Sequence, residues 1–156
     1  MAHGSPRRRL LAILLLGLLP WTVLFIGRDV VSFVFLPGLL DYNPAVTPPL
    51  RGVPVWELFA AGGGLPRNPE AWPASALLYL LSLASACAGV LGREDPRLTG
   101  GALALAGVAH LLVSGAFLHR LAYTPVPIGP VCALALAWWY YWSDVRALVL
   151  APLPEE

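Results

Sequence analysis

The sequence predicts an all-α membrane protein with four transmembrane helices in an up-down bundle and a proline-rich extracytoplasmic segment. Hydrophobic residues make up 58% of the 156 residues and charged residues only 12%, whereas soluble domains average about 45–50% and about 25%. Four apolar runs, at 10–27, 71–92, 98–118 and 126–142, approach the thickness of a bilayer core. The net charge of +1 gives no reason to expect a nucleic-acid partner. We therefore treat 1–156 as one membrane domain.

The first predicted span, 10–27, reads "LLAILLLGLLPWTVLFIG" and would be about 27 Å long as a helix. Arg7, Arg8 and Arg9 precede it, which leaves a cleaved signal peptide as the alternative. No small-x-small cleavage site follows the apolar run, however, and the run is long for the core of a signal peptide. Pro20 is expected to kink the helix mildly, because membrane helices tolerate proline.

The segment 28–70 contains seven prolines, from Pro37 to Pro69, which exclude a long helix. Residues 30–36, "VVSFVFL", are β-branched and aromatic and predict a short strand or a segment lying in the membrane interface. Residues 54–64, "PVWELFAAGGG", predict a short amphipathic helix that starts after proline and stops at glycine. We expect the whole segment to pack on the outer face of the bundle as a subdomain.

The last three spans are separated by short connectors, so they should run alternately up and down. Cytoplasmic loops are enriched in arginine and lysine. A cytoplasmic N-terminus places most of the arginines inside: Arg7, Arg8, Arg9, Arg93, Arg97 and Arg146. The sequence thus predicts a multi-pass protein of the cell membrane with both termini in the cytoplasm.

Four blocks of sequence resemble a known family. They are "RRRLLAILLLGLLPWTVL", "GLPRNPEAWP", "GREDPRLTGG" and "AWWYYWSDVR", and together they resemble an uncharacterised family of small haloarchaeal integral membrane proteins. The resemblance implies about four spans and a halophilic archaeal source. It implies no activity.

His110 is the polar residue that most needs explanation, because it lies in the middle of the third predicted span. Small residues at 100, 104, 107, 114 and 115 form a stripe that lets helices approach closely, and His110 lies at its edge. Matching depths along the spans gives the imidazole four candidate neighbours: Thr22, Tyr79, Ser82 and Cys132. The group is either a hydrogen-bonded packing residue or a ligand or proton site. The lack of an acidic residue at this depth favours packing.

No metal or cofactor is predicted. Zinc takes four ligands, or three and water, and one histidine with one cysteine falls short of that set. Nucleotide-binding loops, G-x-S-x-G and H-E-x-x-H are missing from the sequence, so no catalytic residue is predicted either.

A second candidate site lies on the outer face, at Arg28, Glu57, Arg67 and Glu70. There the arginines Arg28 and Arg67 could hold an anionic group. The other interpretation is that all four are solvated or ion-paired surface groups.

The sequence therefore predicts a structural or accessory membrane protein that acts through helix–helix or protein–protein contacts. Its expected partners are the lipid bilayer and other membrane proteins or a second copy of itself. The alternative is a membrane enzyme or small transporter subunit that uses His110 and the outer Arg and Glu groups.

Overall fold

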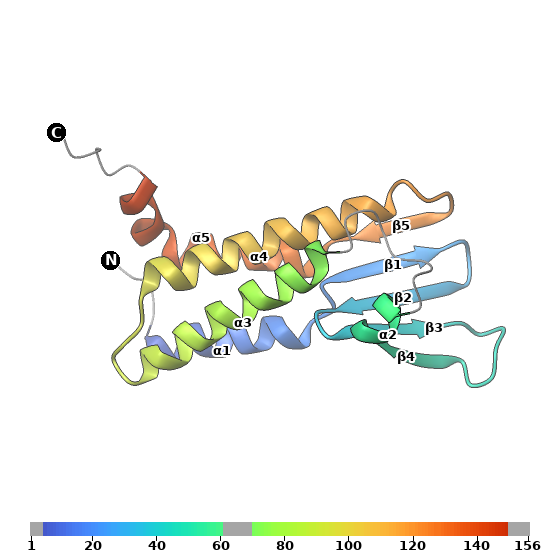
Figure 1. The fold of residues 1–156 in the computed structure, drawn as a ribbon, viewed down its shortest axis with the longest axis horizontal. Helices are drawn as coiled ribbons and strands as arrows, with labels where there is room; N and C mark the ends of the chain where they lie inside the picture. The colour runs from blue at the N-terminus through green and yellow to red at the C-terminus, as the bar shows by residue number, and fades with distance from the viewer. Residues whose placement is uncertain (1–4, 61–69, 150–156) are drawn as a thin grey trace.

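The protein consists of a layer of long helices with an antiparallel sheet at one end (Figure 1). The computed structural model describes residues 5–60 and 70–149. The helices in chain order are α1 (Pro6–Leu18), α2 (Val55–Ala60), α3 (Ala71–Val90), α4 (Pro96–Phe117) and α5 (Ile128–Val149). The strands are β1 (Thr22–Ile26), β2 (Val30–Phe35), β3 (Gly38–Tyr42), β4 (Leu50–Pro54) and β5 (Tyr123–Val126).

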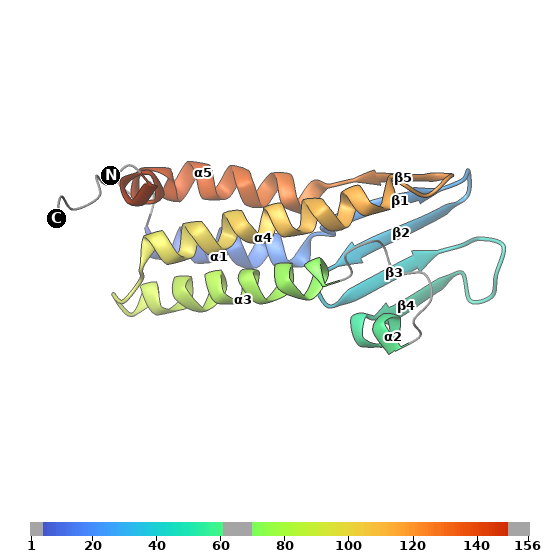
Figure 2. The same ribbon diagram turned by 45° about the horizontal axis from the view of Figure 1, so that its top comes forward.

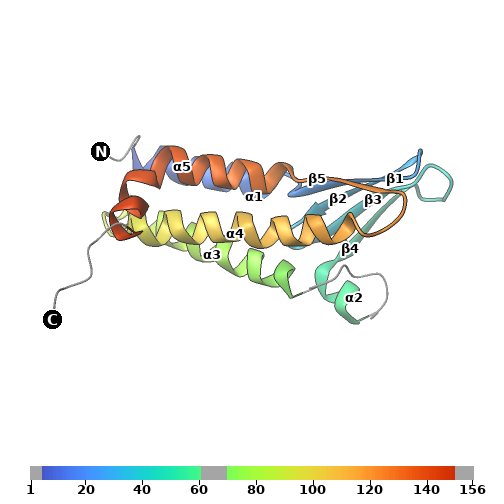
Figure 3. The same ribbon diagram turned by 90° about the horizontal axis from the view of Figure 1, so that it is seen from above.

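The four longer helices lie side by side, and the sheet lies at one end of this helical layer (Figure 2). Contacts join α4 to both α3 and α5, and α1 to the same two helices. The start of α1, the α3–α4 turn and the end of α5 therefore gather at the end opposite the sheet (Figure 3). We call this the arginine end, because Arg7, Arg8, Arg9, Arg93, Arg97 and Arg146 all belong to it.

The sheet has the strand order β4-β3-β2-β1-β5, and every neighbouring pair is antiparallel. Because side chains alternate between the two faces of a strand, the register places Leu24, Ser32 and Asp41 on one face. The helix α2 follows β4 directly. The sheet thus adds a second layer that the ends of α3 and α4 partly cover.

The predicted first span is wrong beyond its first half. The helix ends at Leu18, and Leu19 has φ −77° and ψ 149°, the extended conformation that a residue before proline prefers. Pro20 also lacks the N–H that a continuing helix would need. Thr22 to Ile26 then form β1, and the chain reverses at Gly27 (φ 64°). Pro20 therefore ends the helix and does not merely kink it.

The predicted fold class is also wrong, since a five-stranded sheet accompanies the helices. Among the described residues only α3 and α4 are long and apolar enough to cross a membrane, so an all-α four-span integral membrane bundle is not supported. Helix α1 has 13 residues, which is too few. The second half of the first predicted span forms β1, and the connector before the fourth predicted span forms β5.

Other local predictions are confirmed. Residues 30–35 form β2, and a short helix, α2, follows Pro54; the glycines expected to stop it lie outside the described residues. The spans predicted at 71–92 and 98–118 correspond to α3 and α4. After α3 ends at Val90, Gly92 takes a positive φ of 75°, and the N–H of Arg93 bonds the carbonyl of Ala88 over 3.0 Å, the Schellman arrangement. Asp95 caps α4 by accepting from the N–H groups of Arg97 and Leu98.

Two buried clusters hold the layers together. The larger one lies among the helices and includes Leu16, Trp21, Leu103 and Tyr141. The smaller one joins the sheet to the ends of α3 and α4 through Leu24, Val34, Trp72, Val113 and Phe117. The second cluster fixes the sheet against the helices and so shapes the surface described next.

Candidate functional site

The imidazole of His110 lies fully buried in α4 and bonds to α3. Its Nδ1 lies 3.0 Å from the Ser75 hydroxyl oxygen, and the same hydroxyl donates to the Trp72 carbonyl over 2.7 Å. A serine hydroxyl has one proton, so the oxygen accepts from His110 and the hydrogen is on Nδ1. An activated nucleophile needs the reverse, with histidine accepting the serine proton. The Ser75–His110 pair is therefore arranged for packing.

Two indole rings enclose the imidazole. The centroid of the His110 ring lies 5.2 Å from that of Trp21 and 6.4 Å from that of Trp72, both edge to face. Within the described part of the chain, His110 Nε2 and Trp21 Nε1 have no hydrogen-bond partner. The free acceptor is sealed from the surface, so a proton relay through it would require the helices to separate.

Three of the four neighbours expected for His110 bond elsewhere. Thr22 Oγ1 lies 2.6 Å from Ser114 Oγ, Tyr79 donates to the Ile13 carbonyl over 2.8 Å, and Ser82 donates to the Thr99 carbonyl over 3.0 Å. Cys132 is half-buried with a free thiol. The true partner, Ser75, was missed.

The cause of this miss is the register between α3 and α4. Depth matching set the start of α4 level with the end of α3. In the structure Thr99 Oγ1 lies 2.7 Å from Ser85 Oγ, so position 99 is level with position 85 of α3, whereas the predicted span ends would place it level with position 91. His110 consequently lies level with Ser75 and not with Tyr79 or Ser82.

A second buried polar cluster closes the arginine end. Arg9 Nη1 lies 3.1 Å from Glu94 Oε2, with the two side chains 7% and 9% exposed. The Tyr141 hydroxyl donates to Glu94 Oε1 over 2.9 Å, and the Arg9 guanidinium lies 5.4 Å from the centroid of the Tyr141 ring. The Glu94 carboxylate, in the turn between α3 and α4, thus links α1 to α5. We call these three residues the Arg9–Glu94–Tyr141 cluster.

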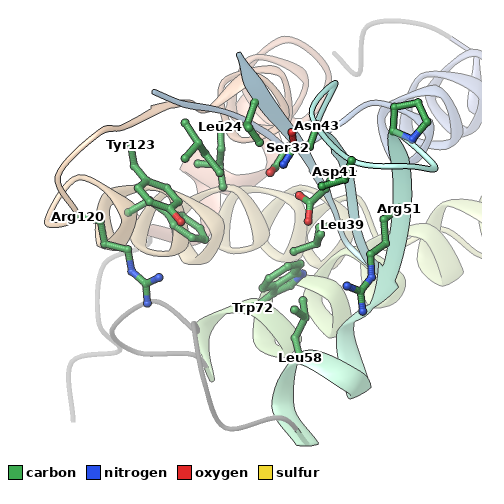
Figure 4. Close-up of a pocket in the computed structure, with 15 residues that line it drawn as sticks. Leu24, Ser32, Leu39, Asp41, Asn43, Arg51, Leu58, Trp72, Arg120 and Tyr123 are labelled. Carbon is green, nitrogen blue, oxygen red and sulfur yellow. The ribbon is translucent and has the colours of Figure 1, made fainter. Parts of the chain in front are cut away.

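A third candidate site is a cavity of about 350 Å³ on the sheet, which we call the sheet pocket (Figure 4). Its apolar lining includes Leu24, Leu39, Leu58, Trp72 and Phe117, and its polar lining is Ser32, Asp41, Asn43, Arg51, Arg120 and Tyr123. Figure 4 shows Arg120 and Arg51 on opposite sides, with Asp41 and Trp72 between them. A cavity with mostly apolar walls and a few placed polar groups is typical of small-molecule sites.

The four residues of the predicted outer-face site do not come together around this cavity. Arg28 is exposed at the β1–β2 turn, Glu57 is exposed on α2, and Glu70 is exposed just before α3. Arg67 lies outside the described residues. The arginines that line the sheet pocket are Arg51 and Arg120 instead. The spacing of Leu39 and Asp41, which places both side chains on one face of β3, was a signal in the sequence for the pocket face of this strand.

A group of three or more His, Cys, Asp or Glu side chains that could hold a metal is not found in the part of the chain that the structure describes. The sheet pocket offers one carboxylate, two guanidinium groups and neutral polar groups. These groups are suited to hold a ligand through hydrogen bonds and charge.

These features define a class of protein: a helical layer with apolar outer faces, buried polar ties between its helices, and a terminal sheet with a pocket. A family model described as a domain of unknown function (DUF8050) matches residues 1–151. The chain belongs to this family. None of the curated proteins compared with the chain matches it. The resemblance to haloarchaeal membrane proteins stays a prediction.

The role of the His110 imidazole can be tested by substitution. We expect His110→Leu to lower the free energy of unfolding by about 1–2 kcal/mol, because the Ser75 oxygen loses its buried donor. His110→Gln should cost less, since its amide can donate to the same oxygen. Thermal unfolding of the purified variants measures both, and Ser75→Ala should add little to His110→Leu. If glutamine is as harmful as leucine, the shape of the ring matters and the hydrogen bond does not.

Proposed function

We propose that the protein is an accessory membrane protein whose helices lie in lipid and whose sheet presents a binding pocket at one membrane surface. The observation that carries this proposal is the exposure of large apolar side chains on all four long helices. Soluble monomers rarely expose a continuous apolar surface of this extent. Each of the following is more than half exposed: Leu15 and Leu18 in α1, Leu77 in α3, Leu105 in α4, and Val131 and Trp139 in α5.

Helix length supports the same placement. Helices α3 and α4 have 20 and 22 residues and are therefore about 30–33 Å long, close to the hydrocarbon thickness of a bilayer. Only 33% of the apolar window in α3 is buried inside the protein, which leaves most of that window to face lipid. Helices α1 and α5 lie against this pair and add apolar outer surfaces.

The distribution of charge supports an orientation. The arginine end carries Arg7, Arg8, Arg93 and Arg97, all exposed, whereas the helices between the two ends carry apolar outer faces. By the positive-inside rule this end lies in the cytoplasm. The sheet and its pocket then lie on the extracytoplasmic side.

The buried polar groups support an accessory role over a catalytic one. The Ser75 hydroxyl donates to a carbonyl and is not available for attack, and the Arg9–Glu94–Tyr141 cluster is closed by its own contacts. The sheet pocket offers binding groups. The function is thus to hold a ligand or partner at the membrane.

Membrane placement and orientation can be tested together. We expect the protein to remain with membranes after extraction at alkaline pH, because the apolar helix faces are solvated by lipid. In a background in which Cys87 and Cys132 are replaced by alanine, a membrane-impermeant maleimide should label Val46→Cys in intact cells. Arg97→Cys, the matched control at the arginine end, should react only after permeabilisation. Release by alkali would contradict the membrane placement, and the reverse labelling would contradict the orientation.

A further inference from the structure

We infer that the sheet pocket binds an amphipathic anion, a molecule with an apolar chain and a phosphate or carboxylate head. The inference rests on the proposed function only in placing the pocket at the membrane surface. It is carried by the lining of the pocket, its charge and its size.

The apolar part of the pocket is held rigidly. Trp72 forms the floor, and its indole N–H lies 3.1 Å from the carbonyl oxygens of both Phe35 and Leu36. This contact fixes the ring at the junction of β2 and β3. Leu24 and Phe117 pack with Trp72 in the same buried cluster. A ligand therefore meets a preformed apolar surface, which lowers the entropic cost of binding.

The polar part of the pocket favours an anion. Asp41 and Arg51 are directly opposite each other on β3 and β4, so their charges largely offset one another. Arg120 lies across the cavity, with its guanidinium 5.8 Å from the centroid of the Tyr123 ring. The lining thus holds two guanidinium groups and one carboxylate, and guanidinium is well suited to phosphate and carboxylate.

The size of the cavity limits the ligand. Its volume of about 350 Å³ corresponds to roughly a dozen non-hydrogen atoms, at about 30 Å³ for each water-sized group. A whole two-chain lipid is far larger. Two sources supply the required chemistry: a free single-chain amphiphile, or the headgroup and first carbons of an anionic phospholipid in the adjoining leaflet.

The test is a titration of the purified full-length protein in a non-ionic detergent, followed by the midpoint of thermal unfolding. Octyl phosphate should raise the midpoint saturably, whereas octanol and inorganic phosphate should not, because each lacks half of the required chemistry. Dioctanoyl phosphatidylglycerol distinguishes the sources. A saturable effect of this lipid assigns the site to lipid headgroups, and an effect of octyl phosphate alone assigns it to free amphiphiles.

Variants locate the binding. Arg51→Gln and Arg120→Gln should each weaken octyl phosphate binding about 5- to 10-fold, the loss of one charge-assisted contact. Asp41→Asn should strengthen it about 3-fold, because a repelling carboxylate disappears. Arg28→Gln, at the exposed β1–β2 turn outside the pocket, should change nothing. The midpoint without ligand shows that each variant is folded.

Three results would overturn the inference: no saturable effect of octyl phosphate or the lipid, equal effects of octanol or inorganic phosphate, or binding that survives both arginine substitutions. None of these results bears on alkaline extraction or maleimide labelling. A failed ligand site is therefore distinguishable from a failed membrane placement.

Discussion

Glu94→Gln is expected to destabilise the protein by about 3–5 kcal/mol, the typical loss when one member of a buried ion pair is removed. The Arg9 and Glu94 side chains are only 7% and 9% exposed, so the substitution removes the negative charge of Glu94 from beside a buried guanidinium. Glu94 also accepts the hydrogen bond from Tyr141 on α5. The substitution therefore weakens two ties between helices at once. Unfolding by denaturant in mixed micelles measures the change in free energy.

A double variant separates the effect of the buried charges from the effect of side-chain volume. Arg9→Met combined with Glu94→Leu should cost far less than Glu94→Gln, because an apolar pair of similar volume leaves no buried charge. Glu57→Gln, at an exposed position on α2, is the matched control and should change the free energy by less than about 0.5 kcal/mol. If Glu94→Gln proves as mild as Glu57→Gln, the Arg9–Glu94 contact is not buried in the folded protein.

Part of this cluster was predictable from the sequence. The positive-inside rule groups the arginines at 7–9 as cytoplasmic charge, yet Arg9, Ile13 and Leu16 are spaced four and three residues apart. That spacing places them on one face of a helix, and all three are the buried residues of α1. The partner was not predictable, because Glu94 reaches Arg9 across 85 residues of sequence. No local pattern specifies such a contact.

The sheet escaped prediction for a related reason. Residues 22–26, "TVLFI", continue a run of leucines, and a short apolar run does not distinguish a strand from a buried helix. What makes this segment a strand is its pairing with β2 and, almost a hundred residues later, with β5. Pro20 was the local signal that the helix ends before this segment. The central helices α3 and α4 were predictable because their apolar runs and caps are continuous in the sequence.

The sheet pocket was not predictable for the same reason, because contacts between distant parts of the sequence form it. Its residues come from all five strands with no shared local motif, and Trp72 and Phe117 come from the ends of two helices. Arg51 and Arg120 are brought to one cavity only by the strand order β4-β3-β2-β1-β5. The expectation that Arg28 and Arg67 hold an anion on the outer face stays a prediction, and the anion site at Arg51 and Arg120 is a separate proposal.

Gly100→Ala is the second substitution with a large expected effect, a loss of about 1–3 kcal/mol from overpacking. A Cβ atom at Gly100 would collide with the Cβ of Tyr141 and approach its ring at 3.0 Å and Val145 Cγ2 at 3.1 Å. To relieve this contact, α5 must move away from α4. Thermal unfolding and denaturant titration in mixed micelles measure the loss.

The neighbouring glycine supplies the control. A Cβ at Gly101 meets no heavy atom within 4 Å, so Gly101→Ala should be neutral or stabilise α4 by up to about 1 kcal/mol through helix propensity. Because Tyr141 also bonds Glu94, moving it should disturb the Arg9–Glu94–Tyr141 cluster. Gly100→Ala and Glu94→Gln should then be less harmful together than the sum of their separate costs. Equal effects of the two alanine substitutions would mean that α4 and α5 do not approach closely at Gly100.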